Sequence, residues 1–168
     1  MTRHKNWFRQ EPKDFQRKSL GGRDFAKRYL FDADFRNTQL EGVVFDKAML
    51  EGARFDNAVL IGASIRNAHL AHAKFRGSDL TNADLSYDRD LYIKNNTCYY
   101  VDFSQATLQN ANLSRSPMTY ARFERSILVQ VNLNRATLIA ADLSSSNLQK
   151  SDLRFTNLSR AKLVGCDL

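Results

Sequence analysis

The sequence contains little cysteine and no long hydrophobic segment. Cys98 and Cys166 are the only two cysteines among 168 residues, too few for a disulfide framework. No apolar run approaches the length of a membrane-spanning helix, and the basic start of the chain, residues 1–12, lacks the apolar core of a signal peptide. These features argue against a disulfide-stapled domain, and they predict one cytoplasmic domain without a membrane span.

Motifs for catalysis and for cofactor binding are also missing. The sequence has no Walker loop, nucleophile elbow or HExxH pattern, and its glycines form no phosphate-binding motif. The carboxylates are scattered among cations and form no catalytic pair. His69 and His72 should both face outward, but they lack a third ligand nearby. We therefore predict a protein that is not an enzyme and that uses no metal or cofactor.

A five-residue repeat organises most of the chain. A bulky apolar residue recurs at every fifth position, and a small residue stands two places before it. From 33 to 85 the bulky positions are Phe35, Leu40, Phe45, Leu50, Phe55, Leu60, Ile65, Leu70, Phe75, Leu80 and Leu85. A period of five advances roughly 140° around a helix and therefore draws no apolar stripe. In a flat strand it would send successive bulky residues to opposite faces. The chain must turn a corner once per pentad, and stacked coils then bury a continuous column.

Several units of this repeat resemble the A(D/N)Lxx unit of pentapeptide-repeat proteins. The units are Ala83-Asp84-Leu85, Ala111-Asn112-Leu113 and Ala141-Asp142-Leu143. The resemblance covers nearly the whole chain. It implies an all-β fold, a right-handed quadrilateral parallel β-helix, and the bulky positions then predict about eight coils. The alternation of Phe and Leu from Phe15 to Leu60 independently favours an even number of sides.

The repeat divides into two blocks of one continuous solenoid, 13–85 and 93–168. Leu85 and Ile93 are eight residues apart, which is one pentad plus three. Three extra residues inside a coil would point polar groups inward, so we predict an inserted loop at 86–92. After it the column should resume at Ile93 and Cys98.

The start of the chain is basic and aromatic. Residues 1–19 carry six basic and two acidic groups, a net charge of +4 out of a total of +7. Residues 1–12 also hold Trp7 and Phe8. We favour a cap in which these aromatics cover the open end of the column. The alternative is an arm that binds nucleic acid or an anionic surface.

Cations replace the small inner residues in the first four pentads. They are Lys13, Lys18, Arg23 and Arg28. We interpret this ring as an end effect, in which each long stem lies on the core while its charge reaches water. The alternative is a site for an anion or an acidic partner.

Outward tyrosine and arginine residues are the best indication of a binding surface. Tyr100 and Tyr120 are twenty residues apart and should stack on adjacent coils, and Arg115 and Arg135 have the same spacing. With the other tyrosines near the insertion, the candidate partner-binding set is Tyr87, Tyr92, Tyr99, Tyr100, Tyr120, Arg115 and Arg135. Interfaces enrich both residue types, but aromatic ladders also stabilise sheets. Both roles therefore stay open.

The repeats continue to the last residue of the sequence. An uncovered core and exposed strand edges favour pairing. We predict an end-to-end homodimer through Leu158, Leu163 and Leu168, with a truncated chain as the alternative.

These observations favour a rigid scaffold that binds a protein partner. The resemblance also suggests family members that protect DNA gyrase from quinolone-type inhibitors by imitating acidic duplex DNA. This sequence departs from them, because Arg54 and Lys74 follow Asp14 and Asp34 in one outward row and the expected C-terminal dimer helix is missing. A secreted bacterial effector, or a binder of nucleic acid through the basic start, is a further alternative that we rank lower.

Overall fold

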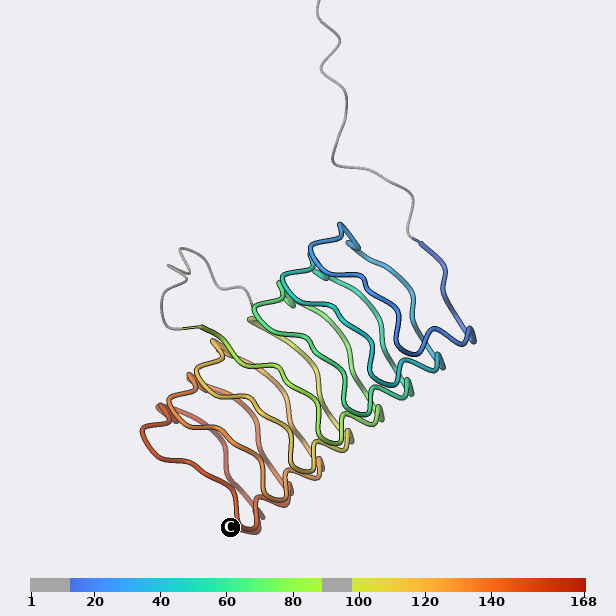
Figure 1. Cartoon of the computed structure of the whole chain (residues 1–168). Helices are drawn as coiled ribbons and strands as arrows, with labels where there is room; N and C mark the ends of the chain where they lie inside the picture. The colour runs from blue at the N-terminus through green and yellow to red at the C-terminus, as the bar shows by residue number, and fades with distance from the viewer. Residues whose placement is uncertain (1–12, 89–97) are drawn as a thin grey trace, which may run out of the picture.

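The computed structural model describes residues 13–88 and 98–168, which form a four-sided rod of stacked coils (Figure 1). Coils pair through parallel bridges between single residues, such as Asp14 with Asp34 and Asp34 with Arg54. Within the described ranges there is neither a helix nor a strand longer than one bridged residue. The same ranges contain no helix that is long and apolar enough to cross a membrane.

Each pentad forms one side of a coil, as 53–57 illustrates. The side chains of Ala53 and Phe55 point inward and are fully buried, while Arg54 lies between them on the outside. The corner follows at 56–57, and the Ala58 amide donates to the Phe55 carbonyl across it at 2.9 Å. This geometry confirms the inward assignment of the bulky and small positions.

The second corner residue has a left-handed backbone. Gly42 and Asn57, for example, have φ angles of 62° and 57°, which these residue types tolerate. Gly and Asn therefore fit several of these corners. The rod also places longer residues at the same positions, including Tyr120 at φ 59°. The Tyr120 amide donates to the Ile139 carbonyl of the next coil at 2.9 Å. This hydrogen bond between coils stabilises a left-handed backbone conformation that the tyrosine side chain disfavours.

The four sides are named here by the bulky residues that they send into the core. The first side carries Phe15, Phe35, Phe55, Phe75, Phe103, Phe123, Leu143 and Leu163. The second carries Leu20, Leu40, Leu60, Leu80, Leu108, Leu128, Leu148 and Leu168. The third carries Phe25, Phe45, Ile65, Leu85, Leu113, Leu133 and Leu153. The fourth carries Leu30, Leu50, Leu70, Cys98, Met118, Leu138 and Leu158.

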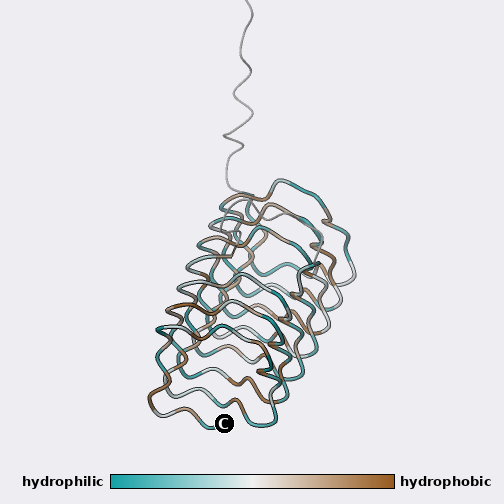
Figure 2. Cartoon of the chain, turned by 90° about the vertical axis from the view of Figure 1, so that its left-hand side faces the viewer, coloured by the Kyte–Doolittle hydropathy of each residue, from teal (hydrophilic) through white to brown (hydrophobic). Residues whose placement is uncertain are grey.

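Phenylalanine rings form a stack along the first side. Phe35 and Phe55 are parallel with centroids 4.9 Å apart, and Phe55 and Phe75 follow at 4.6 Å. Rings of the opposite third side meet them edge-on, as Phe45 does with Phe55 at 5.6 Å. Opposite sides therefore carry like residues, as the Phe–Leu alternation predicts. Hydrophobic and hydrophilic residues alternate along every coil (Figure 2).

The insertion is longer than the sequence suggests. Lys74 pairs with Asp102 twenty-eight residues later, whereas the other bridges in this row join residues twenty apart, so this coil holds eight extra residues. Cys98 takes the column position after Leu85, and the prediction that Ile93 resumes the column after three extra residues is wrong. The pairing of Lys74 with Asp102 places Phe75 and Phe103 on the same side, so Cys98 is the fourth-side residue of this coil. Ile93 itself lies outside the described residues.

The predicted loop at 86–92 begins within the coil. The Ser86 carbonyl accepts from the Asn67 amide at 3.1 Å, and the Asp88 amide donates to Asn67 Oδ1 at 2.9 Å. Residues 89–92 lie outside the described ranges, as does the predicted cap or arm at 1–12.

The cationic ring lies on the surface of the first coil. Lys13, Lys18, Arg23 and Arg28 are all exposed. Lys18 Nζ lies 5.4 Å from the centroid of the Phe15 ring and donates to the Asp14 carbonyl at 2.9 Å. This placement agrees with a stem that lies on the core while its charge reaches water.

Candidate functional site

The candidate site lies on the fourth side and its two corners. An aromatic corner, defined by His72, Tyr100 and Tyr120, lies between the fourth and first sides. The rings of Tyr100 and Tyr120 stack with centroids 4.9 Å apart and planes within 9°, which confirms the predicted stack. Their exposed fractions of 50% and 47% leave one half of each residue open to solvent.

His72 extends this stack by one coil. Its ring is nearly parallel to Tyr100 at 5.5 Å, and Tyr99 meets its edge at 4.8 Å. The sequence does not reveal this contact, because the insertion puts twenty-eight residues between His72 and Tyr100 instead of twenty. Only the bridge pattern of Lys74 with Asp102 brings them together.

An arginine corner, defined by Arg115 and Arg135, lies between the third and fourth sides. Both residues are exposed, with φ angles of 60° and 61°. The guanidinium of Arg135 lies 5.4 Å from the ring centroid of Phe155, which is 78% exposed. Neither arginine forms an ion pair with another described residue, in contrast to Arg36 and Arg54 on the first side.

Short uncharged side chains connect the two corners. On the coil of Tyr120 the outward residues are Pro117 and Thr119, and on the next coil they are Thr137 and Ile139. All four are half-buried. The fourth side therefore presents a neutral floor between a row of tyrosines and a row of arginines.

The first side has a different electrostatic character. Asp102 faces Arg76 at 3.1 Å and Arg122 at 4.0 Å, and Arg122 also pairs with Glu124 at 3.1 Å. The Glu124 carboxylate raises the pKa of Arg122, while the hydrogen bond from Arg36 lowers the pKa of Asp34. The charged groups named here are therefore ion-paired within the chain.

Two further carboxylates show the same behaviour. Burial opposes ionisation of Asp142, but hydrogen bonds from Ser144 and Lys162 hold its pKa below the ordinary value. On the third side, hydrogen bonds from Arg154 lower the pKa of Asp152 to about 2. Shifted carboxyl groups of this kind mark structural ion pairs on the charged sides, because each has its own cation or hydroxyl partner.

Tyr87, a member of the predicted partner-binding set, does not contribute to this surface. Tyr87 is only 4% exposed. Its hydroxyl donates to the Ala68 carbonyl and lies 2.9 Å from Cys98 Sγ. The prediction that Tyr87 binds a partner is therefore wrong, because the residue fills the column beside the insertion. Tyr92 lies outside the described residues.

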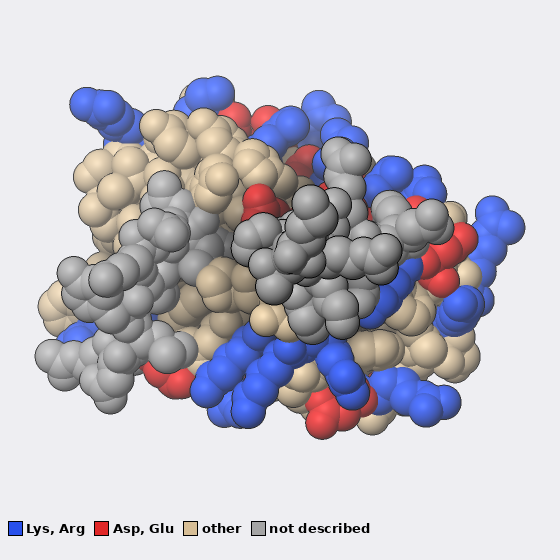
Figure 3. All heavy atoms as spheres, turned by 90° about the horizontal axis from the view of Figure 1, so that it is seen from above, with Lys and Arg blue, Asp and Glu red and all other residues tan. Residues whose placement is uncertain are grey.

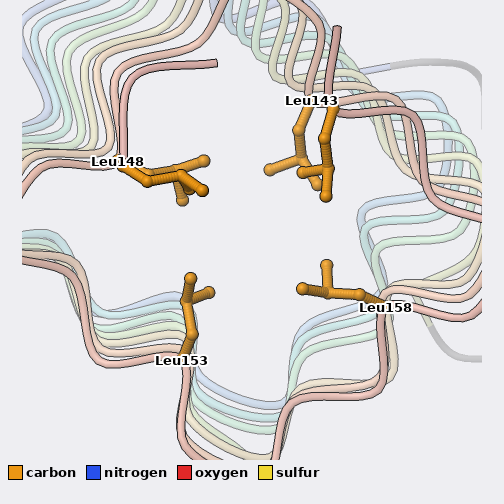
Figure 4. Close-up of a pocket in the computed structure, with 6 residues that line it drawn as sticks. Leu143, Leu148, Leu153 and Leu158 are labelled. Carbon is orange, nitrogen blue, oxygen red and sulfur yellow. The ribbon is translucent and has the colours of Figure 1, made fainter.

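The last coil leaves its leucines open. Six leucines line a cavity of about 60 Å³, and the labelled four point toward one another (Figure 4). They are Leu143, Leu148, Leu153, Leu158, Leu163 and Leu168. Leu168 is 71% exposed and Leu163 39%. The lining is entirely aliphatic, so it offers no polar group to a ligand.

The described residues hold no group of three or more His, Cys, Asp or Glu side chains placed to bind a metal ion. Among the described residues visible in Figure 3, acidic side chains lie between basic ones and form no continuous stripe. Cys98 is buried in the column, as its position predicts.

Comparisons with known proteins agree with this geometry. The family profile described as "Pentapeptide repeats" matches in eight copies, over residues 29–67, 53–86, 98–135 and 132–168. Comparison with curated protein sequences gives no match.

Solved structures with a similar fold include two relevant proteins. HetL, a pentapeptide repeat protein involved in heterocyst differentiation regulation from the cyanobacterium Nostoc sp. strain PCC 7120, is 26% identical with a TM-score of 0.56. The match covers 92% of this chain and 76% of HetL. QnrB1, a plasmid-mediated fluoroquinolone resistance protein, is 20% identical with a TM-score of 0.48, and the match covers 94% of this chain and 80% of QnrB1.

Proposed function

The chain belongs to the pentapeptide-repeat family, and from this premise we propose that it is a non-catalytic, rigid scaffold that binds a protein partner through its fourth side. One observation carries the proposal. The exposed Tyr100–Tyr120 stack and the arginine corner face solvent across a neutral floor. Tyr and Arg are the residues that most often dominate binding energy at protein interfaces.

The rod supports this role through its stiffness. Every corner amide of the two tyrosines and two arginines is bonded to the next coil, as the Arg115 amide is to the Asn134 carbonyl at 2.9 Å. Side chains held on such a frame lose little conformational entropy on binding. We propose about eight right-handed coils, a rod of about 37 Å at roughly 4.8 Å per coil.

The similarity to HetL supports a regulatory, non-catalytic role. That protein is described as involved in the regulation of differentiation. Binding through a fixed surface suits regulation, because the partner recognises a surface that does not have to rearrange.

Site-specific photo-crosslinking tests the proposal. A benzophenone amino acid replaces Tyr120 on the fourth side or Ile127 on the second side, and the two variants are irradiated in an extract of the native host. Ile127 is a matched control because it is 43% exposed, close to the 47% of Tyr120. We expect a discrete crosslinked partner from position 120 alone. Equal products from both positions, or none from either, would contradict a binding role for the fourth side.

Protection of DNA gyrase is an alternative function that we rank lower. Imitation of DNA requires an acidic stripe, whereas the first-side row contains both signs of charge, in Asp34, Arg54, Lys74 and Asp102. A supercoiling assay with a fluoroquinolone distinguishes the two functions. Protection by stoichiometric amounts of the protein would reverse the ranking.

A second copy of the chain is a further partner that we propose. It would cover the open leucines of the last coil, in particular Leu158, Leu163 and Leu168. Sedimentation should then show a dimer that Leu163→Glu dissociates, because the interface would bury a charge. A dilute monomer that is unchanged by this substitution would refute the dimer.

A further inference from the structure

We propose that the partner element recognised by the fourth side is an acidic amphipathic α-helix that lies along the rod axis. Its carboxylates would contact the arginine corner, and its apolar residues would pack on Tyr100 and Tyr120. This inference rests on the proposed function and specifies the chemistry of its partner.

Charge on the fourth side is the first argument. The described residues 98–100, 115–120 and 135–140 include two arginines and no carboxylate. Neither arginine is ion-paired within the described chain, although six other arginines of the rod are. Those six are Arg36, Arg54, Arg66, Arg76, Arg122 and Arg154. The surface therefore offers two exposed cations without internal counter-charges, which complements an acidic partner.

Nearby carboxylates do not neutralise this surface. Asp102 and Asp142 on the adjoining first side are engaged by Arg76 and Lys162, both at 3.1 Å. Asp88, at the edge of the insertion, accepts a hydrogen bond from Asn67 Nδ2 at 2.8 Å one coil before the arginine corner. An incoming carboxylate would thus meet Arg115 and Arg135 with limited competition from the protein's own acids.

The spacing of the rows is the second argument, and it favours a helix over an extended strand. Arg115 and Arg135 occupy equivalent corners of adjacent coils, as do Tyr100 and Tyr120, and coils repeat every ~4.8 Å. Residues i and i+3 or i+4 of an α-helix are separated by about 4.5–6 Å along its axis. Residues i and i+2 of a strand are separated by about 6.6 Å. The spacing of side chains along a helix is therefore closer to the spacing of successive coils than the spacing along a strand is.

The width of the side also suits a helix. Arg115 and Tyr120 are five residues apart, which limits their Cα separation to about 17 Å. An α-helix with its side chains is about 10–12 Å across. The residues between the rows, Pro117 and Thr119, are short enough to let a helix approach both corners at once.

Fluorescence anisotropy with a designed peptide tests the inference. The probe is a labelled amphipathic peptide of about 20 residues, long enough to form a helix, with glutamates beside an aliphatic stripe. One comparison peptide carries lysine in place of every glutamate, and another carries a central proline that breaks the helix. Each is titrated with the full chain, with Arg115→Asn/Arg135→Asn and with the control Arg125→Asn.

The variants are matched in backbone geometry. Arg125 is exposed, has φ 56°, forms no ion pair with a described residue and lies on the opposite corner, between the first and second sides. Asparagine tolerates this conformation, so all three substitutions keep the corners intact.

We expect the glutamate peptide to bind, and the double variant to weaken its binding roughly five- to tenfold, as for two exposed ion pairs. Arg125→Asn should leave it unchanged. Tyr100→Asn/Tyr120→Asn should weaken it by about tenfold or more. Equal binding of the lysine or proline peptide, an equal loss in Arg125→Asn, or no binding of the glutamate peptide would overturn the inference.

The two proposals fail separately. If the glutamate peptide does not bind but the benzophenone at position 120 still captures one partner, the scaffold function stands and the acidic helix is wrong. If position 120 captures nothing, the proposed function fails as well.

Discussion

The first and fourth sides of the rod carry outward rows of opposite character. The first-side row runs through Asp34, Arg54, Lys74 and Asp102, and three of these four residues form ion pairs with residues of the adjoining corner. In the described part of the chain, the fourth-side row consists of Tyr29, Met49, His69, Pro117, Thr137 and Asn157 and contains no Asp, Glu, Lys or Arg. Exposed ion pairs contribute little to stability and still keep a surface soluble. The neutral fourth side and its aromatic corner do not improve solubility in this way, so their presence favours a binding role.

The interiors of the same two sides are equivalent. Phe55 and Leu50 are both fully buried, and so are their small partners Ala53 and Ala48. Folding constrains the inward positions of every side equally and leaves the outward positions free to vary. The outward residues, which differ between the two sides, are therefore the ones that indicate function.

Truncation of the core should have the largest effect and should be similar on both sides. Phe55→Ala on the first side should lower the free energy of unfolding by about 3–5 kcal/mol, and Leu50→Ala on the fourth by about 2–5 kcal/mol. Both remove buried surface and leave a cavity. Chemical denaturation measures them, and a loss below about 0.5 kcal/mol for both would contradict the buried column.

Enlargement of the small inner residues should have the next largest effect. Ala53→Leu and Ala48→Leu add three carbons where the column is closed, and each should cost about 1–3 kcal/mol. Thermal unfolding of the two variants measures the loss. If only one side tolerated leucine, the interiors would not be equivalent.

Removal of the aromatic stack should affect stability modestly. Tyr100→Asn/Tyr120→Asn keeps the left-handed corners and should cost about 0.5–1.5 kcal/mol, the value of an aromatic pair. Urea denaturation beside the wild-type chain tests it. A loss above about 3 kcal/mol would show that the stack is mainly structural.

Removal of the first-side carboxylates should have the smallest effect on stability, and its signature is a change in the response to acid. The folded-state pKa values of Asp34 and Asp142 lie below the ordinary 3.8, so their stabilisation is complete above that pH and is lost as the pH falls through the folded-state values. Asp34→Asn/Asp142→Asn should cost under about 1 kcal/mol at neutral pH and should flatten the acid dependence of the melting temperature. An unchanged acid dependence would show that these pairs contribute nothing.

The architecture could be predicted because the inward pattern has a single period. Phe35, Phe45 and Phe55 recur at a spacing that only a cornered chain can bury, and the corner residues follow from it. The Tyr100–Tyr120 stack was predictable for the same reason, since both residues lie after the insertion and keep the spacing of twenty.

Contacts across the insertion could not be predicted. The sequence allows the column to resume at Ile93 or at Cys98, and only the pairing of Lys74 with Asp102 decides. The stack of His72 on Tyr100 and the burial of Tyr87 both depend on that choice. The sequence contains no signal for either, because the length of an insertion does not reveal how much of it leaves the coil.

The most direct test of the account combines two measurements on Tyr100→Asn/Tyr120→Asn. Its free energy of unfolding is determined beside that of the wild-type chain, and a benzophenone at Ile139, on the floor between the two corners, reports partner capture in each background. We predict that stability falls by no more than about 1.5 kcal/mol while the crosslinked partner disappears. Full capture of the partner by the double variant would contradict the claim that the fourth side is the binding surface.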